Sequence, residues 1–243
     1  MKIKNILVVN DDGIEAEGLR KLAEAALRFG RVWVAAPHSQ CSAVSQKISV
    51  FERVTVTPCA FPVPVEAAWS VQGTPADCVK VALRRLLPVR PDLVVSGVNN
   101  GYNAGFDIAY SGTVGAAMEA LMQGIPAIAF SKGYNSSFEI TETYLPLLLE
   151  DLMLAPPERH EMWNVNFPGI PLEECRGILI DRTVAPLQLY QDHFENEEQH
   201  ENGAFSYQNL GIHVTREEAP EGSDVRAVLD GFVSVGTIRC GLL

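Results

Sequence analysis

Two adjacent carboxylates, Asp11 and Asp12, follow directly after the short apolar run of residues 4–9. Carboxylates this close repel each other unless a cation lies between them, and hard oxygen ligands suit Mg²⁺, Mn²⁺ or Ca²⁺. The same residues also fit a turn from a strand into a helix, because Asp and Gly13 are turn residues and Asp can cap a helix. The local sequence therefore leaves a metal site and a structural turn both open.

A run rich in glycine and asparagine, residues 96–105, follows another apolar stretch. Its glycines allow the backbone to approach a ligand closely, and side chains such as Asn99 and Asn103 offer neutral donors and acceptors. A segment of this composition is often only a loop. Its position after an apolar stretch favours a binding role.

A hydroxyl, a glycine and a second hydroxyl, at Ser111, Gly112 and Thr113, open a predicted helix of small residues. The free N–H groups and the dipole of a helix N-terminus attract anions. Ser111 also fits the commoner role of a plain N-cap. The segment thus predicts either an anion-binding helix start or an ordinary cap.

Residues 37–45 carry a weaker signal. They follow an apolar stretch and hold small polar groups, Ser42 among them, and His38 is the one histidine at a predicted strand end. Cys41 and Cys78 lie near the predicted site, but no histidine can be paired with either of them. We therefore expect no thiol nucleophile.

Residues 73–78 open a further predicted helix, with Thr74 as the expected cap and Pro75 at the first helical position. Most of this signal is structural, although Thr74 could face the site.

Predicted strands and helices alternate along the chain around these residues. Continuous apolar runs of strand length are typical of strands covered on both faces of a parallel sheet, and helical spacing follows them. The expected strands cover residues 4–9, 31–36, 92–96 and 127–131, and the expected helices cover 15–27, 76–87 and 112–122. This alternation predicts an α/β fold with a doubly wound, mostly parallel sheet, whose ligands bind at the carboxyl ends of the strands. Four segments should therefore converge on one crevice: 10–13, 37–45, 97–111 and 131–135.

The rest of the chain has a different character. Prolines interrupt the β-branched residues of 49–72, which predicts a hairpin or meander at the sheet margin. Residues 192–201 are acidic and poor in apolar side chains, and they predict an exposed loop or arm flanked by short strands at 177–183 and 210–215. We expect a catalytic core over 1–172, including the 49–72 insertion, and a C-terminal extension over 173–243 that carries the arm and an oligomerisation segment.

Length, composition and net charge limit which partners and substrates the chain can bind. With 243 residues, 47% of them hydrophobic, the chain can bury a large core. Its net charge of −11 argues against binding of long nucleic acid, which depends on clustered Lys and Arg. If the substrate is an anion, its site must be made locally positive by a metal ion or by backbone N–H groups.

Three features predict a cytoplasmic protein without a membrane partner. Residues 1–10 do not read as a signal peptide, and no stretch reaches the length of a membrane span. The five cysteines are odd in number and include no Cys-x-x-Cys pair, which disfavours a disulfide framework and a cysteine zinc site.

Taken together, the motifs resemble the SurE (survival protein E) family of 5′/3′-nucleotidases in type, order and spacing. The motifs are Asn-Asp-Asp-Gly-Ile at 10–14, Ala-Pro at 36–37 with Ser42, Gly-Thr-Pro-Ala-Asp-Cys at 73–78, Ser-Gly-Val-Asn at 96–99 and Ser-Gly-Thr-Val at 111–114. The resemblance continues more weakly in Asn-Val-Asn-Phe-Pro at 164–168 and in 223–235. It implies a Rossmann-like fold with a small C-terminal β-hairpin extension and assembly into a homodimer or homotetramer through the C-terminal half.

The resemblance also implies a site and an activity. One divalent ion per subunit, Mg²⁺ or Mn²⁺, would be held by the residues that match the family ligands, which are Asp11, Asp12, Ser42 and Asn99. The substrate would be a nucleoside 5′-monophosphate, or a 3′-monophosphate, hydrolysed to nucleoside and phosphate. Asn99, Asn103, Ser111, Gly112 and Thr113 would bind the substrate and its phosphate. As a hypothesis, Asp11 or Asp12 acts as a base toward water or attacks phosphorus directly.

The chain departs from the family pattern at three places. His38 stands where the family usually has Asp, Ala43 stands where a glycine is frequent, and Val-Gly-Thr at 235–237 replaces the usual Val-Thr-Pro. The first two could alter substrate preference, and the third bears on the oligomer.

Three other classes of protein share part of this pattern. A phosphorylation-dependent receiver module also has an early acidic pair and a Lys like Lys132, but it needs a carboxylate where this chain has residues 96–99. A haloacid-dehalogenase-type phosphatase separates its two Asp residues by one position. A nucleotide-binding protein without catalysis stays open until phosphate release is measured.

Overall fold

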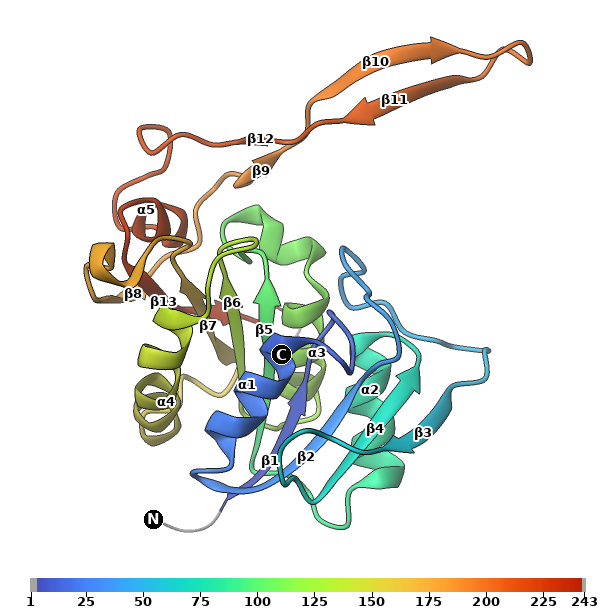
Figure 1. Cartoon of the computed structure of the whole chain (residues 1–243), viewed down its shortest axis with the longest axis vertical. Coiled ribbons are helices and arrows are strands. Elements are labelled where there is room, and N and C mark those ends of the chain that lie inside the picture. The colour runs from blue at the N-terminus through green and yellow to red at the C-terminus, as the bar shows by residue number, and fades with distance from the viewer. Residues whose placement is uncertain (1–3, 242–243) are drawn as a thin grey trace.

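Six parallel strands form the middle of a nine-stranded sheet in the computed structural model, which describes residues 4–241 (Figure 1). Their spatial order is β4-β2-β1-β5-β6-β7, and every neighbouring pair in this row is parallel. The strands are β1 (Lys4–Val9), β2 (Gly30–Pro37), β4 (Ala67–Gln72), β5 (Leu93–Asn100), β6 (Ala127–Lys132) and β7 (Glu161–Phe167). The expected α/β fold with a mostly parallel sheet is confirmed.

The chain reverses its direction of travel between β1 and β5. From β1 it winds outward through β2 and β4 on one side, and then returns to start β5 on the other side of β1. In an open α/β sheet this reversal leaves a crevice at the carboxyl ends of the two strands, which is where ligands bind. The fold therefore predicts the site at the ends of β1 and β5.

Both edges of the sheet depart from the parallel pattern. β3 (Thr55–Cys59) pairs antiparallel with β4, so the expected pair within 49–72 forms, but β4 itself lies inside the sheet as a parallel neighbour of β2. At the other edge β13 (Val233–Arg239) pairs antiparallel with β7, and β8 (Ile178–Arg182) pairs parallel with β13. The C-terminal segment thus adds two strands to the same sheet. The division of the chain into a core over 1–172 and an extension over 173–243 stays a prediction.

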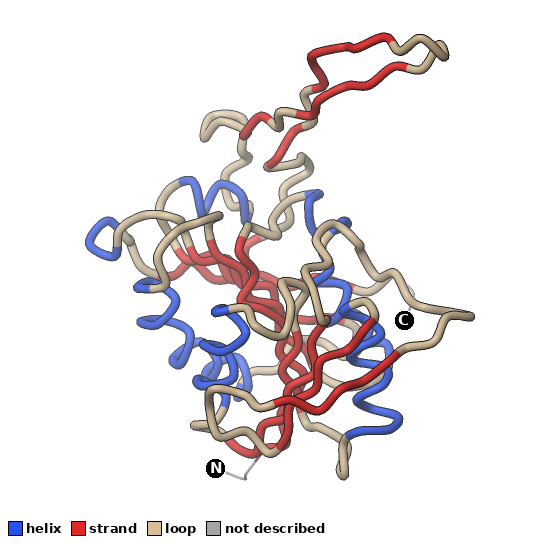
Figure 2. Tube along the Cα trace, turned by 45° about the vertical axis from the view of Figure 1, so that its right-hand side comes forward, coloured by secondary structure: helices blue, strands red, loops and turns tan. Residues whose placement is uncertain are grey.

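Helices cover both faces of the sheet, as Figure 2 shows. Side chains of β1 alternate between two cores: Ile6 and Val8 pack with α1 and α4, whereas Leu7 and Val9 pack with α2 and α3. This alternation follows from the period of two residues in a strand. The helices are α1 (Glu17–Ala26), α2 (Pro75–Val81, extended by a wider turn at Ala82–Leu86), α3 (Gly112–Met122), α4 (Glu139–Leu154) and α5 (Asp224–Leu229), with short 3₁₀ turns at Phe106–Tyr110 and Leu172–Glu174.

A long hairpin projects from the body of the molecule (Figures 1 and 2). It consists of β10 (Phe194–Gln199) and β11 (Phe205–Asn209), and the short pair β9 (Tyr190–Gln191) and β12 (Ile212–His213) joins it to the body. The expected arm is present, but residues 194–199 form a strand and not a loop. Backbone pairing makes this strand without any buried side chain, so the usual apolar alternation is missing from the sequence. Within residues 4–241, no helix is both long and apolar enough to cross a membrane.

Gly18 provides a test of how α1 packs on the sheet. A Cβ atom at this position would lie 2.0 Å from the carbonyl oxygen of Val98 on β5. Alanine normally stabilises a helix relative to glycine by up to about 1 kcal/mol, but backbone overlap of this kind costs more. We expect Gly18→Ala to lower the free energy of unfolding in urea by about 2–3 kcal/mol. Glu24→Ala, at an exposed position of the same helix, is the control and should change stability little; a stabilised Gly18→Ala protein would contradict this packing.

Candidate active site

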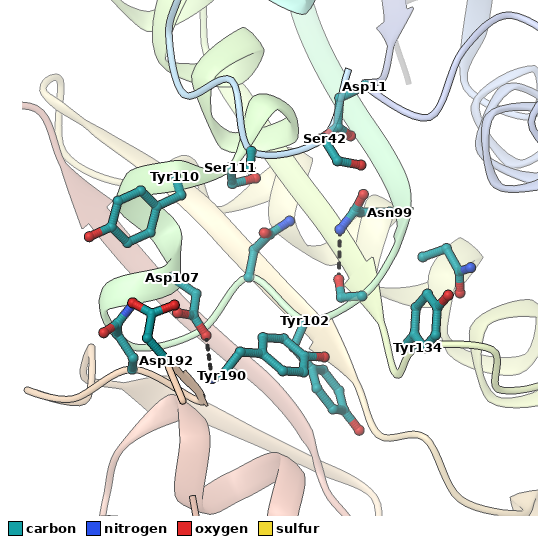
Figure 3. A pocket seen from close by; sticks show the side chains of 15 residues that line it. Asp11, Ser42, Asn99, Tyr102, Asp107, Tyr110, Ser111, Tyr134, Tyr190 and Asp192 are labelled. Carbon is teal, nitrogen blue, oxygen red and sulfur yellow. Dashed lines mark hydrogen bonds between the residues drawn. The ribbon is translucent and has the colours of Figure 1, made fainter. Parts of the chain in front are cut away.

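A cavity of about 560 Å³ opens at the carboxyl ends of β1 and β5. All four segments that are expected from the sequence to converge contribute to its wall. From them come Asp11, Ser42, Ala43, Asn99 to Asn103, Asp107, Tyr110, Ser111 and Tyr134, and the C-terminal segment adds Gln188, Tyr190 and Asp192. Figure 3 shows Asp11, Ser42 and Asn99 at one end of the cavity and Asp107, Tyr190 and Asp192 at the other.

The turn after β1 places the two carboxylates. The side chain of Asn10 donates to the carbonyl of Gly13 at 2.9 Å and accepts from its N–H at 3.2 Å, which closes the turn around Asp11 and Asp12. Gly13 has φ of +105°, a value that favours glycine. The expected tight turn is therefore present, and it carries the acidic pair.

Asp11 is the more buried of the pair, with 4% of its surface exposed. Its carboxylate accepts a hydrogen bond from the hydroxyl of Thr113, in the first turn of α3. Burial raises the pKa of Asp11 to about 6, and repulsion from Asp12 adds to this shift while the Thr113 hydrogen bond opposes it. The structure thus holds a carboxylate close to the start of a helix and poorly compensated by other protein groups.

Asp12 points away from this cavity, toward a second hollow lined also by Gln40, Asn100 and Lys132. Its carboxylate accepts from the N–H of Asn100 at 3.0 Å and from the Gln40 side chain at 3.5 Å. Burial raises the pKa of Asp12, and the Asn100 N–H and the charge of Lys132 oppose the shift. The two adjacent carboxylates therefore face different hollows.

Ser42 and Asn99 bring neutral oxygen atoms to the Asp11 end of the cavity (Figure 3). The Ser42 hydroxyl accepts from the side chain of Gln40 at 2.9 Å. The regular pairing of β5 with β6 is interrupted between Ser96 and Asn99, and the Asn99 side-chain nitrogen donates to the carbonyl of Gly101 at 2.7 Å. This bond uses the nitrogen of Asn99 and leaves its side-chain oxygen to serve as an acceptor.

The start of α3 abuts Asp11. A Cβ atom on Gly112 would lie 2.8 Å from the Cβ of Asp11, so a residue with a side chain here would force the helix away from the carboxylate. The Ser111 hydroxyl accepts from the N–H of Val114 at 3.0 Å, which is the N-cap role. Ser111 also lines the cavity, so the cap and the candidate anion site coincide.

Other candidate residues lie elsewhere. Thr74 is part of a capping box with Asp77 and donates to the carbonyl of Lys47, and it does not line the cavity. His38 contacts the Ser70 hydroxyl at 3.2 Å on an exposed surface. Burial raises the pKa of the Cys41 thiol, which is unfavourable for a nucleophilic thiolate.

The far end of the cavity is built partly from residues that the sequence analysis did not single out. Asp107 accepts from the N–H groups of Leu189 and Tyr190, both at 3.0 Å, and so fixes the C-terminal segment against the loop before α3. Tyr190 and Asp192 then complete the wall (Figure 3). More than 80 residues separate Asp107 from them in the sequence, and no local pattern marks that contact.

The donor set available for a cation consists of oxygen atoms. Within the described part of the chain, no three His, Cys, Asp or Glu side chains form a group that could hold a metal ion. The two carboxylates would need the Ser42 hydroxyl and the Asn99 amide oxygen to complete a site, and such hard ligands suit Mg²⁺ or Mn²⁺. Among the described residues that line the cavity, none is Lys, Arg or His.

Comparisons with known proteins show which family this chain resembles. The model of one protein family, described as Survival protein SurE, matches residues 6–187. A 5′-nucleotidase SurE from Synechococcus is 40% identical over 241 residues, covering 97% of this chain and 91% of the relative. A 5′-nucleotidase SurE from Protochlamydia amoebophila is 38% identical, covering 97% of this chain and 90% of the relative.

A crystal structure of SurE protein from Aquifex aeolicus superposes with a TM-score of 0.83 at 34% identity, covering 98% of this chain and 94% of that chain. The fold and the sequence are thus both similar to those of SurE proteins over nearly the whole chain. The protein therefore belongs to the SurE family.

Proposed function

We propose that this protein is a phosphoric monoester hydrolase that converts nucleoside 5′-monophosphates to nucleoside and phosphate and depends on a divalent metal ion. The observation that carries the proposal is the convergence of Asp11, Ser42 and Asn99 with the start of α3 on one cavity. The names of the relatives support the substrate class. We propose nucleoside 3′-monophosphates as a second substrate class.

The metal requirement is supported by charge. A phosphate entering a cavity without a lining cation, in a chain of net charge −11, needs a local positive charge. We propose one Mg²⁺ or Mn²⁺ ion per subunit, held by Asp11, Asp12, Ser42 and Asn99. When bound there, the ion would neutralise charge on the phosphate and orient the attacking group.

The remaining roles belong to the chain itself. The first N–H groups of α3, at Gly112 and Thr113, are suited to bind phosphate oxygens, because a helix N-terminus offers unpaired donors and a favourable dipole. Ser111 and Asn103, which also line the cavity, add side-chain donors. Asp11 is the carboxylate on the cavity side, and we assign it the role of accepting a proton from the attacking water. The tyrosines that line the cavity, such as Tyr110 and Tyr134, provide apolar surface for the nucleoside.

The first test measures phosphate release. We expect the wild-type protein to release phosphate from nucleoside 5′-monophosphates with Mg²⁺ or Mn²⁺, more slowly from 3′-monophosphates, and not at all with a chelator. Asp12→Asn should lower kcat at least about 100-fold, since a lost metal interaction removes several kcal/mol of transition-state stabilisation.

Asp151→Asn, at an exposed position near the end of α4, is the matched control and should keep wild-type turnover. Wild-type turnover in a folded Asp12→Asn variant would remove Asp12 from the site. A folded wild-type protein that binds nucleotide but releases no phosphate with any metal would favour the non-catalytic binding protein instead.

The second test uses the buried charge of Asp11. Burial raises the pKa of Asp11 to about 6 in the folded metal-free protein, whereas an Asp carboxyl in the unfolded chain has a pKa near 3.9. Between these two pH values the folded protein therefore binds a proton at Asp11 that the unfolded chain does not bind. This group therefore destabilises the metal-free fold increasingly as pH rises from about 4 to about 6, and the effect levels off at higher pH. We expect metal-free Asp11→Asn to exceed the wild type in free energy of unfolding by about 1–3 kcal/mol at pH 8, with the difference shrinking toward pH 4.

Urea unfolding with a chelator measures this difference, and added Mn²⁺ should then stabilise only the wild type. A difference that does not depend on pH would contradict the proposed origin of the effect.

We also propose a homodimer or homotetramer formed through the C-terminal half, in the cytoplasm and without long nucleic acid as a partner. The projecting hairpin supports the assembly, because it exposes the large apolar side chains Phe194, Phe205 and Tyr207. All five cysteines are free, which is compatible with a reducing compartment.

Light scattering after size-exclusion chromatography tests the assembly. We expect a dimer or tetramer mass for the wild type and a lower mass for the double variant Phe194→Ser, Phe205→Ser, which loses apolar surface that a partner would cover. Leu147→Ser on α4, also an exposed apolar position, is the control and should keep the wild-type mass. A monomeric wild type would refute the assembly.

A further inference from the structure

Two neighbouring strands hold Asn103 through their side chains. Ser131 on β6 and Asn166 on β7 lie opposite each other at the carboxyl ends of these strands, and both are buried together with Asn103. The side-chain oxygen of Asn166 accepts from the N–H of Asn103 at 2.9 Å, and its nitrogen donates to the Asn103 carbonyl at 3.0 Å. One side-chain amide therefore satisfies both peptide groups of a single residue, as a partner strand does in an antiparallel pair.

This arrangement supports a loop that has left the sheet. Gly101 donates to the carbonyl of Lys132 at 3.0 Å, and the N–H of Gly105 donates to the carboxylate of Asp224 at 2.9 Å. Between these two points Asn166 holds the peptide groups of Asn103, and Asn164 donates to the same carbonyl at 2.9 Å. Both asparagines belong to the Asn-Val-Asn-Phe-Pro segment at 164–168, to which the proposed reaction gives no role.

The side chain of Asn103 is oriented separately. Its nitrogen donates to the Ser131 hydroxyl at 2.8 Å, and the residue lines the candidate active-site cavity. An amide nitrogen carries two hydrogens, so one remains for an acceptor in the cavity. Ser131 thus fixes the plane of the amide, while Asn166 fixes the backbone from which it extends.

We propose that Asn166 is a positioning residue for phosphate: it fixes Asn103 so that the second amide hydrogen of Asn103 reaches a phosphate oxygen. This proposal rests on the proposed function, in which Asn103 binds the phosphate. Asparagine suits position 166 because a carboxylate would accept from the Asn103 N–H but could not donate to its carbonyl, and an apolar residue would do neither.

The experiment is a double-mutant cycle of Asn166→Ala and Asn103→Ala. We measure KM and kcat for a nucleoside 5′-monophosphate, the Kd for inorganic phosphate by calorimetry with Mn²⁺ present, and Tm. Asn166→Ala should raise KM and the phosphate Kd about 10-fold or more, the change expected when a hydrogen bond to a charged oxygen is lost.

The Asn103→Ala background separates positioning from stability. The backbone of residue 103 still needs its partner there, so Asn166→Ala should lower Tm in both backgrounds. Its effect on KM and phosphate Kd should vanish in the Asn103→Ala background. Additive effects in the double variant, or an unchanged phosphate Kd in folded Asn166→Ala, would overturn the proposal.

Two further variants keep the test decisive. Asn164→Ala removes a donor to the Asn103 carbonyl but leaves the Asn103 N–H satisfied, so it should lower Tm and change KM less than about 3-fold. An increase in KM as large as that of Asn166→Ala would count against the proposal. If Asn166→Ala does not fold, Ser131→Ala releases only the Asn103 side chain. Its weaker phosphate binding should likewise vanish in the Asn103→Ala background, and persistence there would refute positioning through Asn103.

The phosphate Kd also separates the two proposals. A wild type that binds phosphate but hydrolyses no nucleotide would refute the proposed function, while the binding cycle still decides the role of Asn166. A wild type that neither binds nor releases phosphate would overturn both.

Discussion

The contact between Asp11 and Thr113 is the interaction on which the site depends. It joins the carboxyl end of β1 to the start of α3, and it requires a glycine at position 112 because a side chain there would meet the carboxylate. The contact brings a buried negative charge next to a helix N-terminus, whose partial positive charge favours anions. The proposed cation at Asp11 and a phosphate bound at the helix start would therefore lie side by side.

The topology explains why these groups meet. The reversal of winding between β1 and β5 opens the crevice, and the loops after β1, β2, β5 and β6 all end at that edge of the sheet. The buried parallel strands fix the point at which each of these polar loops begins. The same edge carries Ser131 and Asn166, so the sheet supplies both the site and the support of the Asn103 loop.

The C-terminal segment is part of the site as well as of the sheet. Asp224 accepts from the N–H groups of Gly105 and Ala185, both at 2.9 Å, and Asp107 accepts from those of Leu189 and Tyr190. Burial raises the pKa of Asp224 in spite of these bonds. Two buried or half-buried carboxylates thus tie the loop before α3 to a segment that continues directly into the projecting hairpin. The far wall of the cavity and the candidate assembly arm are in this way one continuous piece of chain.

The parallel core can be predicted from the sequence alone, since buried strands and amphipathic helices such as α1 leave local patterns of period and apolar length. The sequence also placed Asp11, Ser42, Asn99 and Ser111 in segments at or after the strand ends, and the structure brings these segments to one cavity. Three other features depend on tertiary packing. Strands β13 and β8 extend the sheet, Asp12 turns toward a second hollow, and Tyr190 and Asp192 close the far end of the cavity. The helix α4 contains Pro146 and is apolar around much of its surface, so it lacks the one-sided pattern that marks α1. The physical reason is that local periodicity records which face of an element is buried, whereas contacts between residues far apart in the sequence depend on how the elements pack.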